Sequence, residues 1–287
     1  MNESAHEFVL TLTCPDRPGI VRDVSTYIAA NGGNIADSAQ FGDPETNLFS
    51  MRIHFVTGSE DNMEEALRDG FAEVADQYDM GWGLHDYSKP ARVLIMVSKF
   101  DHCLADLLYR QRMGELRIDI PAIVSNHRDT YQLAAQHDIP FFHLPVSAET
   151  KAKQEAKLLE LVEQENIDFV VLARYMQILT TELCDTLRGR VINIHHSFLP
   201  GFKGARPYHQ AHSRGVKLIG ATAHYATADL DEGPIIEQDV SRVTHAQTAE
   251  ELVAVGREIE TRVLSRAVRY QSEYRIMLNG DKTVVFN

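Results

Sequence analysis

Residues 193–204 and 220–236 contain the side-chain types that acyl chemistry requires. Asn193 and His195 stand two residues apart at the end of an apolar run, so on a β-strand they point to the same side. An amide that donates and an imidazole that exchanges a proton can stabilise an oxyanion on an acyl carbon. Asp231, in the second segment, offers a carboxylate that can hold the imidazolium and steer water. These three are our candidate catalytic residues.

A purely structural interpretation of the same residues stays open at this point. Asn193 could satisfy backbone groups at a strand end, His195 could pack in the interior, and the acids could form a solvated turn. Asp229 and Glu232 flank Asp231, and neighbouring like charges tend to raise the pKa of a carboxyl group. Spacing alone does not separate the catalytic interpretation from the structural one.

The two segments together resemble the folate-dependent formyltransferase domain. The likeness rests on Asn-Ile-His-x-Ser-x-Leu-Pro-x-x-x-Gly at 193–204, and on Gly-x-Thr-x-His followed by Leu-Asp-x-Gly-Pro-Ile-Ile at 220–236. It extends from about Arg92 to near Val243 and includes Ala-Arg-Tyr-Met-Gln-Ile-Leu at 173–179. Because the combination is long, we treat the match as specific.

The resemblance implies roles for particular residues. The catalytic trio of that family falls on Asn193, His195 and Asp231, and its pterin lies against the backbone of 176–179 and in the loop 226–231. The substrate-binding residues implied in this way are Met176, Gln177, Ile178, Leu179, Ala226, Thr227 and Asp229.

A smaller domain precedes this region. Residues 6–86 predict the order βαββαβ, a ferredoxin-like antiparallel sheet with both helices on one face. The segments 14–21 and 31–35 resemble the opening of an ACT domain, a regulatory module that often binds amino acids. An effector carboxylate would meet the helix N-terminus beside a glycine, and the alternative is a plain dimerisation domain. The possible effector-binding residues are Asp16, Pro18, Gly19 and Asn34.

The chain of 287 residues is long enough for two domains. We predict an ACT-like regulatory or oligomerisation domain at 1–86, a linker at 87–90 and a formyltransferase-type catalytic domain at 91–287. In the last, apolar strands alternate with helices, which indicates a Rossmann-like, mostly parallel α/β sheet. A long helix at 248–272 and a hairpin turn at 279–281 close the chain. Paired ACT-like domains make a homo-oligomer, a dimer or tetramer, the expected assembly.

Composition narrows the class of partner. The formal net charge is −13, and so acidic a surface repels phosphate backbones, which argues against nucleic-acid binding. The three cysteines are scattered and the apolar runs are short, so we expect a cytoplasmic protein that neither binds nor spans a membrane. Four cations near the motifs could offset the acidity for an anionic folate: Arg174, Lys203, Arg206 and Lys217.

The acceptor of the formyl group follows from the first strand of the α/β region. Transferases of the resembled family hold a substrate phosphate there with a glycine-rich loop, but residues 97–104 contain no glycine and place Phe100 and Asp101 in it. No RNA-binding extension is visible. With an ACT-like domain in front, the whole chain is similar to the formyltetrahydrofolate deformylases. That resemblance implies hydrolysis of 10-formyltetrahydrofolate to formate and tetrahydrofolate, which supplies formate for purine synthesis and balances the one-carbon pool.

Rival chemistries have little support in the sequence. There is no HExxH, GxGxxG or Walker pattern, and His195 and His196 are neighbours that face opposite sides of a strand, so we expect no metal and no cofactor besides the folate substrate. Asp101 and His102 could simply begin a helix. Two other functions stay open: a non-catalytic folate or amino-acid sensor, and a transferase for a small amine.

Overall fold

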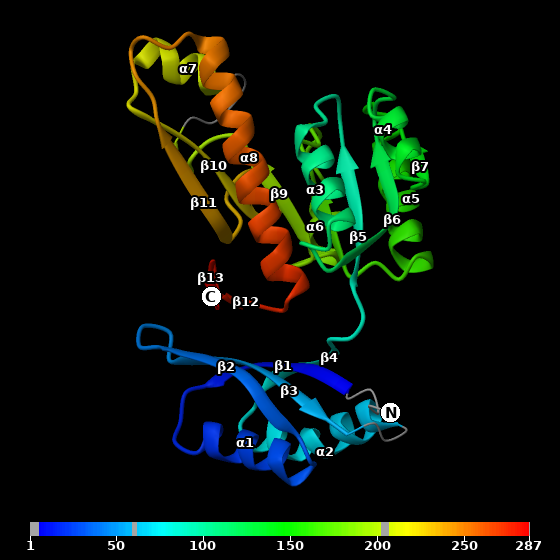
Figure 1. Ribbon diagram of the computed structural model, residues 1–287, viewed down its shortest axis with the longest axis vertical. Coiled ribbons are helices and arrows are strands. Elements are labelled where there is room, and N and C mark those ends of the chain that lie inside the picture. The colour runs from blue at the N-terminus through cyan, green and yellow to red at the C-terminus, as the bar shows by residue number, and fades with distance from the viewer. Residues whose placement is uncertain (1–5, 59–61, 202–206, 287) are drawn as a thin grey trace. The chain divides into compact units, whose positions relative to one another are not determined.

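The computed structural model describes residues 6–58, 62–201 and 207–286, and Figure 1 shows their course. The chain divides into two compact units. One comprises Met1–Pro90 with Glu273–Asn287, and the other comprises Ala91–Ser272. Each unit is built around a separate cluster of buried apolar side chains.

The first unit has the predicted ferredoxin-like order. Its four strands form an antiparallel sheet in the order β2-β3-β1-β4, and Figure 1 shows both helices on one face of it. Its elements are β1 (His6–Pro15), α1 (Ile20–Ala30), β2 (Asn34–Asp43), β3 (Leu48–Thr57), α2 (Met63–Gln77) and β4 (Gly81–Asp86).

Alternation and helical spacing explain this arrangement. Phe8, Leu10 and Leu12 of β1 are buried on the helix-facing side, because every second residue of a strand points the same way. Helix α1 presents Val24 and Ile28, four residues apart, to the same core.

The second unit holds a seven-stranded sheet in the order β11-β10-β9-β8-β5-β6-β7. The five strands from β9 to β7 run parallel, whereas β10 and β11 are antiparallel, so the expectation of a mostly parallel α/β sheet is confirmed. Its elements are β5 (Ala91–Val97), α3 (His102–Arg112), β6 (Ile118–Ser125), α4 (Tyr131–Gln136), β7 (Phe141–His143), α5 (Lys151–Gln164), β8 (Phe169–Leu172), α6 (Thr181–Thr186), β9 (Val191–His195), α7 (Pro207–Arg214), β10 (Leu218–Tyr225), β11 (Ile235–Arg242) and α8 (Ala249–Ser272).

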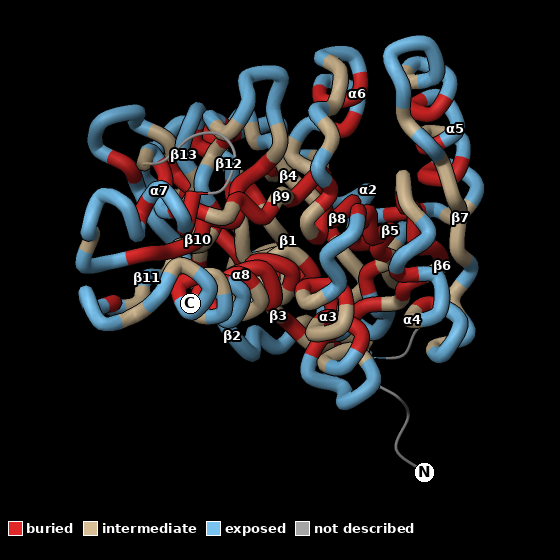
Figure 2. The backbone as a smooth tube through the Cα atoms, turned by 90° about the horizontal axis from the view of Figure 1, so that it is seen from above, coloured by how far each residue is buried: buried red, intermediate tan, exposed pale blue. Residues whose placement is uncertain are grey.

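Helices cover both faces of this sheet. Leu94 and Met96 of β5 pack with Leu158 and Leu161 of α5 on one face. Helix α8 packs against β9, β10 and β11 and against α3. Figure 2 shows buried residues along the strands and exposed residues on the outer sides of the helices. The strands are therefore buried on both faces, which accounts for their continuous apolar sequences.

The C-terminal hairpin differs from the sequence-based division, which assigned 273–287 to the catalytic domain. Its strands β12 (Ile276–Asn279) and β13 (Lys282–Val285) cluster instead with the first unit. The Asn279 side-chain amide donates to Asp43 Oδ2 at 2.7 Å, and Arg52 Nε donates to the Glu273 carbonyl at 3.0 Å. These partners lie far apart in sequence, so no local pattern predicts the attachment.

Two further features bear on the composition, the state of the cysteines and the hydropathy of the helices. Cys14, Cys103 and Cys184 are all buried free thiols. Each lies in the interior of an element or at its end, where a thiol behaves as a small apolar side chain. No helix within the described ranges is both long and apolar enough to cross a membrane.

Candidate active site

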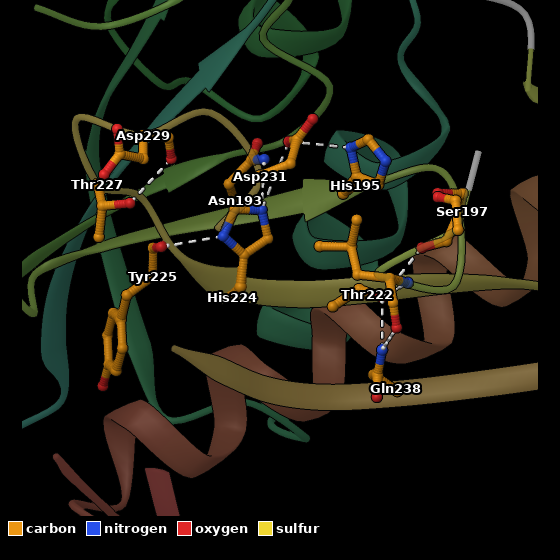
Figure 3. A network of polar contacts seen from close by, with 12 residues as sticks. Asn193, His195, Ser197, Thr222, His224, Tyr225, Thr227, Asp229, Asp231 and Gln238 are labelled. Atoms are coloured by element: carbon orange, nitrogen blue, oxygen red, sulfur yellow. Dashed lines mark hydrogen bonds and ion pairs between the residues drawn. The ribbon is translucent and has the colours of Figure 1, made fainter. Parts of the chain in front are cut away.

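The end of β9 and the loop between β10 and β11 bring the three candidate catalytic residues together. His195 is the last residue of β9, and Asp231 lies in the loop after β10. His195 Nδ1 is 3.0 Å from Asp231 Oδ1, with both side chains largely buried (Figure 3). Since a carboxylate only accepts, Nδ1 carries the proton and donates it. The sequence-based grouping of these two residues therefore corresponds to direct contact.

Asn193 is held by a histidine on the neighbouring strand. Strands β9 and β10 are antiparallel with Asn193 opposite His224, and Asn193 Nδ2 lies 3.1 Å from His224 Nε2 (Figure 3). His224 Nδ1 is 2.9 Å from the Tyr225 carbonyl, which only accepts, so Nε2 is the acceptor for the amide. Burial lowers the pKa of His224 and favours this neutral form. His224 belongs to the Gly-x-Thr-x-His motif, but the motif alone predicts no role for it.

The electrostatics favour a charged Asp231 beside His195. Burial alone would raise the pKa of Asp231, but the hydrogen bond from His195 and the nearby imidazoles lower it below its ordinary value. His195 Nε2 is buried and has no hydrogen-bond partner within the described residues. With Nδ1 bonded to the carboxylate, Nε2 keeps a free lone pair, and His195 is one of the residues that line the cavity.

Close packing fixes the loop that carries Asp231. Gly233 lies against the Tyr225 backbone, and a Cβ at this position would meet the Tyr225 carbonyl oxygen at 1.8 Å. The Tyr225 N–H in turn donates to the Pro234 carbonyl at 2.9 Å. Only glycine allows so close an approach, which explains the Asp-x-Gly-Pro pattern.

A second set of bonds fixes the chain after β9. Thr222 Oγ1 donates to the Ser197 carbonyl at 2.9 Å and accepts from the Leu199 N–H at 3.0 Å. Gln238 Nε2 donates to the same hydroxyl at 3.0 Å, as Figure 3 shows. These contacts join β9, β10 and β11 directly behind the catalytic residues.

A cavity of about 580 Å³ opens in front of the trio. This volume is in the usual range for small-molecule sites. Met176 and Ile178 are more than half exposed at it, and they offer apolar surface to a flat ring. Of the seven predicted substrate-binding residues, Asp229 does not line the cavity, and its carbonyl accepts from Thr227 Oγ1 at 3.0 Å. The six that do are Met176, Gln177, Ile178, Leu179, Ala226 and Thr227.

A buried charged cluster also lines this cavity. Glu260 of α8 is 1% exposed and accepts from His102 Nε2 at 2.8 Å and from the Tyr208 hydroxyl at 2.7 Å. Arg174 Nε lies 3.4 Å from the same carboxylate. Burial alone would raise the pKa of Glu260, but these partners lower it. The signal in the sequence that could have identified Glu260 is a charged residue at a position on the apolar stripe of a long helix.

His102, Cys103 and Glu260 are the group of described residues whose spacing would suit a metal ion. Burial raises the pKa of the Cys103 thiol well above its ordinary value, with a further contribution from Glu260, so the metal-binding thiolate is disfavoured. Arg174 also places a positive charge beside the carboxylate. His102 and Glu260 satisfy each other, and we assign no metal to them.

The structure separates the residues of the expected effector site. Asn34 pairs with Val56 of β3, and Val56 pairs in turn with Glu7 near the start of β1. The other three predicted effector-binding residues come after the end of β1. Glu7 in β1 and Asp16 just after it are nine residues apart, so at about 3.4 Å per residue the two places are roughly 30 Å apart within one chain. Those three residues, in the turn before α1, are Asp16, Pro18 and Gly19.

The four cations expected to offset the acidity have different positions. Arg174 lines the cavity, whereas Lys217, just before β10, does not. Lys203 and Arg206 lie outside the described residues.

Comparison with known proteins agrees with this geometry. Residues 91–268 match the formyl transferase family and residues 8–69 match the ACT domain. A formyltetrahydrofolate deformylase from a Corynebacterium species is 48% identical over 277 residues, 96% of this chain and 97% of its own.

Solved structures agree as well. The formyltetrahydrofolate deformylase of Burkholderia mallei is 53% identical with a TM-score of 0.94, covering 98% of this chain and 100% of its own. Glycinamide ribonucleotide transformylase 1 of Symbiobacterium toebii is 29% identical with a TM-score of 0.65, over 69% of this chain and 95% of its own. The chain therefore belongs to the formyl transferase family and, within it, to the formyltetrahydrofolate deformylases.

Proposed function

We propose that this chain hydrolyses 10-formyltetrahydrofolate to formate and tetrahydrofolate, with Asn193, His195 and Asp231 as the catalytic residues. The observation that carries the proposal is the 3.0 Å contact between His195 Nδ1 and Asp231, which leaves Nε2 of this cavity-lining histidine without a partner among the described residues. An imidazole oriented in this way by a carboxylate is suited to take a proton from water and to return it later.

The first step is attack of water on the formyl carbon. His195 Nε2 takes one proton from the water molecule, and Asp231 stabilises the imidazolium that forms. This assigns the carboxylate an indirect part in deprotonating water, since its Oδ1 is already engaged by His195. The oxygen of the former carbonyl becomes an oxyanion, and the Asn193 amide has a second N–H that can donate to it.

The second step is cleavage of the C–N bond. The His195 imidazolium gives its proton to the departing folate nitrogen, so tetrahydrofolate leaves as a neutral amine. The oxyanion collapses to a carboxyl group, and formic acid loses its proton to give formate. Atoms balance with one water consumed, and no group outside this chain and its substrate is used.

The folate ring fits the apolar side of the cavity. Backbone at 176–179 lies at its edge, and the Met176 N–H is itself fixed by donating to Ser98 Oγ at 2.9 Å. Ala226 and Thr227 line the cavity from the opposite loop, five and four residues before Asp231. A ring held between these segments would present its formyl group to the trio.

Water as the acceptor is supported by the side chains at the start of α3. The Phe100 ring centroid lies 5.7 Å from the guanidinium carbons of both Arg174 and Arg257, and His102 is bonded to Glu260. This end of the cavity is lined by side chains rather than by a glycine-rich backbone with free N–H groups. A phosphorylated amine acceptor has no comparable support.

The deciding experiment measures formate from purified protein and 10-formyltetrahydrofolate without any acceptor. We expect release at an enzymatic rate. Formyl transfer that occurs only when an amine is added would identify a transferase, and no turnover under either condition would identify a sensor. Isotope-labelled water should place one labelled oxygen in the formate.

The wider role that we propose is to balance the one-carbon pool and supply formate for purine synthesis, in the cytoplasm, where reduced buried thiols are typical. For the ACT-like unit we propose assembly into a homo-oligomer, with an amino acid as its possible effector. The match of residues 8–69 to the ACT domain supports this part.

A further inference from the structure

The side chain of Arg174 is buried without the hydrogen bonds that a guanidinium normally makes. It is 10% exposed, and its Nε and Nη1 have no hydrogen-bond acceptor in the described chain. Nε lies 3.4 Å from Glu260 Oε2, but not in hydrogen-bond alignment. An unsatisfied buried donor on a charged group is costly, so it calls for an explanation other than stability.

The position of this guanidinium is set by its surroundings. Arg174 has φ of 64°, a left-handed conformation that is uncommon for a residue other than glycine. Glu260 anchors one edge and is itself held by His102 and Tyr208. Phe100 lies 5.7 Å from the guanidinium carbon. The fork is thus held before any ligand arrives: Arg174 lines the cavity, and its buried Nε and Nη1 have no acceptor within the described chain.

The same cavity contains the catalytic residues. The His196 ring centroid lies 5.1 Å from that of His195 and 6.5 Å from that of Tyr208, whose hydroxyl donates to Glu260. Arg174 and its neighbours Glu260, His102 and Tyr208 therefore lie next to the catalytic trio on the same wall of the cavity. Burial and the charge on Arg174 lower the pKa of His196 to about 4, so the ring between the two sites is neutral.

From this arrangement we infer that Arg174 forms a subsite for a small carboxylate, and that its ligand is the formate released by the reaction. The inference rests on the proposed hydrolysis, because that reaction generates formate beside the anionic Asp231, which repels it. Arg174 lies further along the wall and offers positive charge and free N–H groups.

The chemistry favours a planar monoanion. A carboxylate oxygen accepts a charge-assisted hydrogen bond from a guanidinium N–H, and Nε and Nη1 of Arg174 are the donors left without an acceptor within the described chain. Glu260 lies 3.4 Å from Arg174 Nε, and its carboxylate repels a dianion such as phosphate more strongly than a monoanion. Arg257 adds one exposed positive charge over Phe100. The carboxylates of the folate glutamate tail share this chemistry, and the experiment must separate the two sources.

The experiment measures binding to the full chain directly, without turnover. Carbon-13-labelled formate is titrated with the protein, and its NMR line width gives a dissociation constant. We expect Arg174→Gln to weaken formate binding about tenfold to a hundredfold, as loss of charge-assisted hydrogen bonds implies. Arg174→Lys, which keeps the charge but loses the fork, should fall between. Arg266→Gln removes the same charge at a residue paired with Asp239 outside the cavity, and should bind formate normally.

A parallel series uses p-aminobenzoylglutamate, which carries the tail carboxylates but cannot supply formate. If Arg174→Gln weakens p-aminobenzoylglutamate and leaves formate unchanged, the subsite belongs to the tail and the inference is overturned. Equal formate binding in Arg174→Gln and the parent chain overturns it as well. Thermal unfolding of each variant shows that the fold is kept, and Arg174→Lys provides the comparison if Arg174→Gln does not fold.

Turnover is measured separately. Formate inhibition of deformylation should weaken in Arg174→Gln by the same factor as formate binding. A parent chain that deformylates but binds formate independently of Arg174 overturns only this inference. A parent chain that binds formate through Arg174 but releases none overturns only the proposed hydrolysis.

Discussion

Asn193 and His224 face each other in register across β9 and β10, and the amide nitrogen donates to the imidazole at 3.1 Å. This contact decides which end of the Asn193 carboxamide is nitrogen, because His224 Nε2 can only accept while Nδ1 bonds the Tyr225 carbonyl. The remaining N–H is thereby fixed at the cavity. His224 thus sets the direction of the proposed oxyanion donor.

Removing that donor tests the proposal. Asn193→Ala should lower kcat about a hundredfold to a thousandfold, with a much smaller effect on KM, because an oxyanion donor acts in the transition state. His224→Phe should lower kcat by less, since it frees the amide to rotate but does not delete it. Steady-state formate release measures both. Near-normal kcat in Asn193→Ala would rule out its role.

Replacing the carboxylate tests the pair that orients the imidazole. Asp231→Asn should reduce kcat by two to four orders of magnitude, because a neutral amide neither fixes the His195 tautomer nor stabilises the imidazolium. Glu250→Gln is the control variant, because it also replaces a carboxylate by an amide but at the exposed start of α8. It should retain full turnover. If the two variants behave alike, Asp231 has no part in catalysis.

The glycine behind the loop links packing to activity. A Cβ at Gly233 would lie 1.8 Å from the Tyr225 carbonyl oxygen, so Gly233→Ala must displace the loop that carries Asp231. We expect a loss of roughly 1–3 kcal/mol in unfolding free energy and about a hundredfold loss of kcat. At Gly58 nothing lies within 4 Å, so Gly58→Ala should change neither. Urea denaturation and formate release report the two effects.

The first unit should lose stability in mild acid. Burial, with the charge on Arg68, lowers the pKa of His85 to about 4 from an ordinary value of 6.5. Between pH 6.5 and about pH 4 the unfolded chain binds a proton at His85 that the folded chain does not bind. The free energy of unfolding therefore decreases as the pH is lowered through this range, and His85 contributes no change above pH 6.5. The loss attributable to His85 between pH 7 and pH 5 is about 2 kcal/mol.

Trp82 gives a selective signal for this effect, because it is the single tryptophan and lies on β4 close to His85 in sequence. Urea unfolding followed by its fluorescence should show a smaller difference between pH 7 and pH 5 in His85→Phe than in the parent chain. His212→Gln, at an exposed position of α7 in the other unit, should leave the difference unchanged. An unchanged difference in His85→Phe would show that another group titrates.

The sequence predicted the elements well, because each is a local pattern. Apolar runs gave the strands, and the end of β9 followed from a buried run that stops at polar residues. The contact between His195 and Asp231 needed the antiparallel pairing of β10 with β9, which no local signal encodes. Asp229 was assigned to the substrate with its neighbours, but it does not line the cavity.

Residues of the charged cluster show why the rest of the site was missed. Glu260 lies on the buried stripe of α8, and its charge there is a local anomaly that a helical pattern can reveal. Its partner His102 is 158 residues away in sequence, and Arg174 reaches it from the end of β8. Such pairs depend on how the sheet is wound, so composition and periodicity do not predict them.

Because β12 and β13 cluster with the first unit, the catalytic unit is an insertion within the other unit, joined to it by both of its ends. Trimming the chain after α8 would therefore damage the ACT-like part while sparing every residue of the trio. Asp43 would lose its bond from Asn279. An expression clone of Ala91–Ser272 contains the whole catalytic unit. A clone of Met1–Pro90 alone lacks Glu273–Asn287 and therefore contains only part of the ACT-like unit.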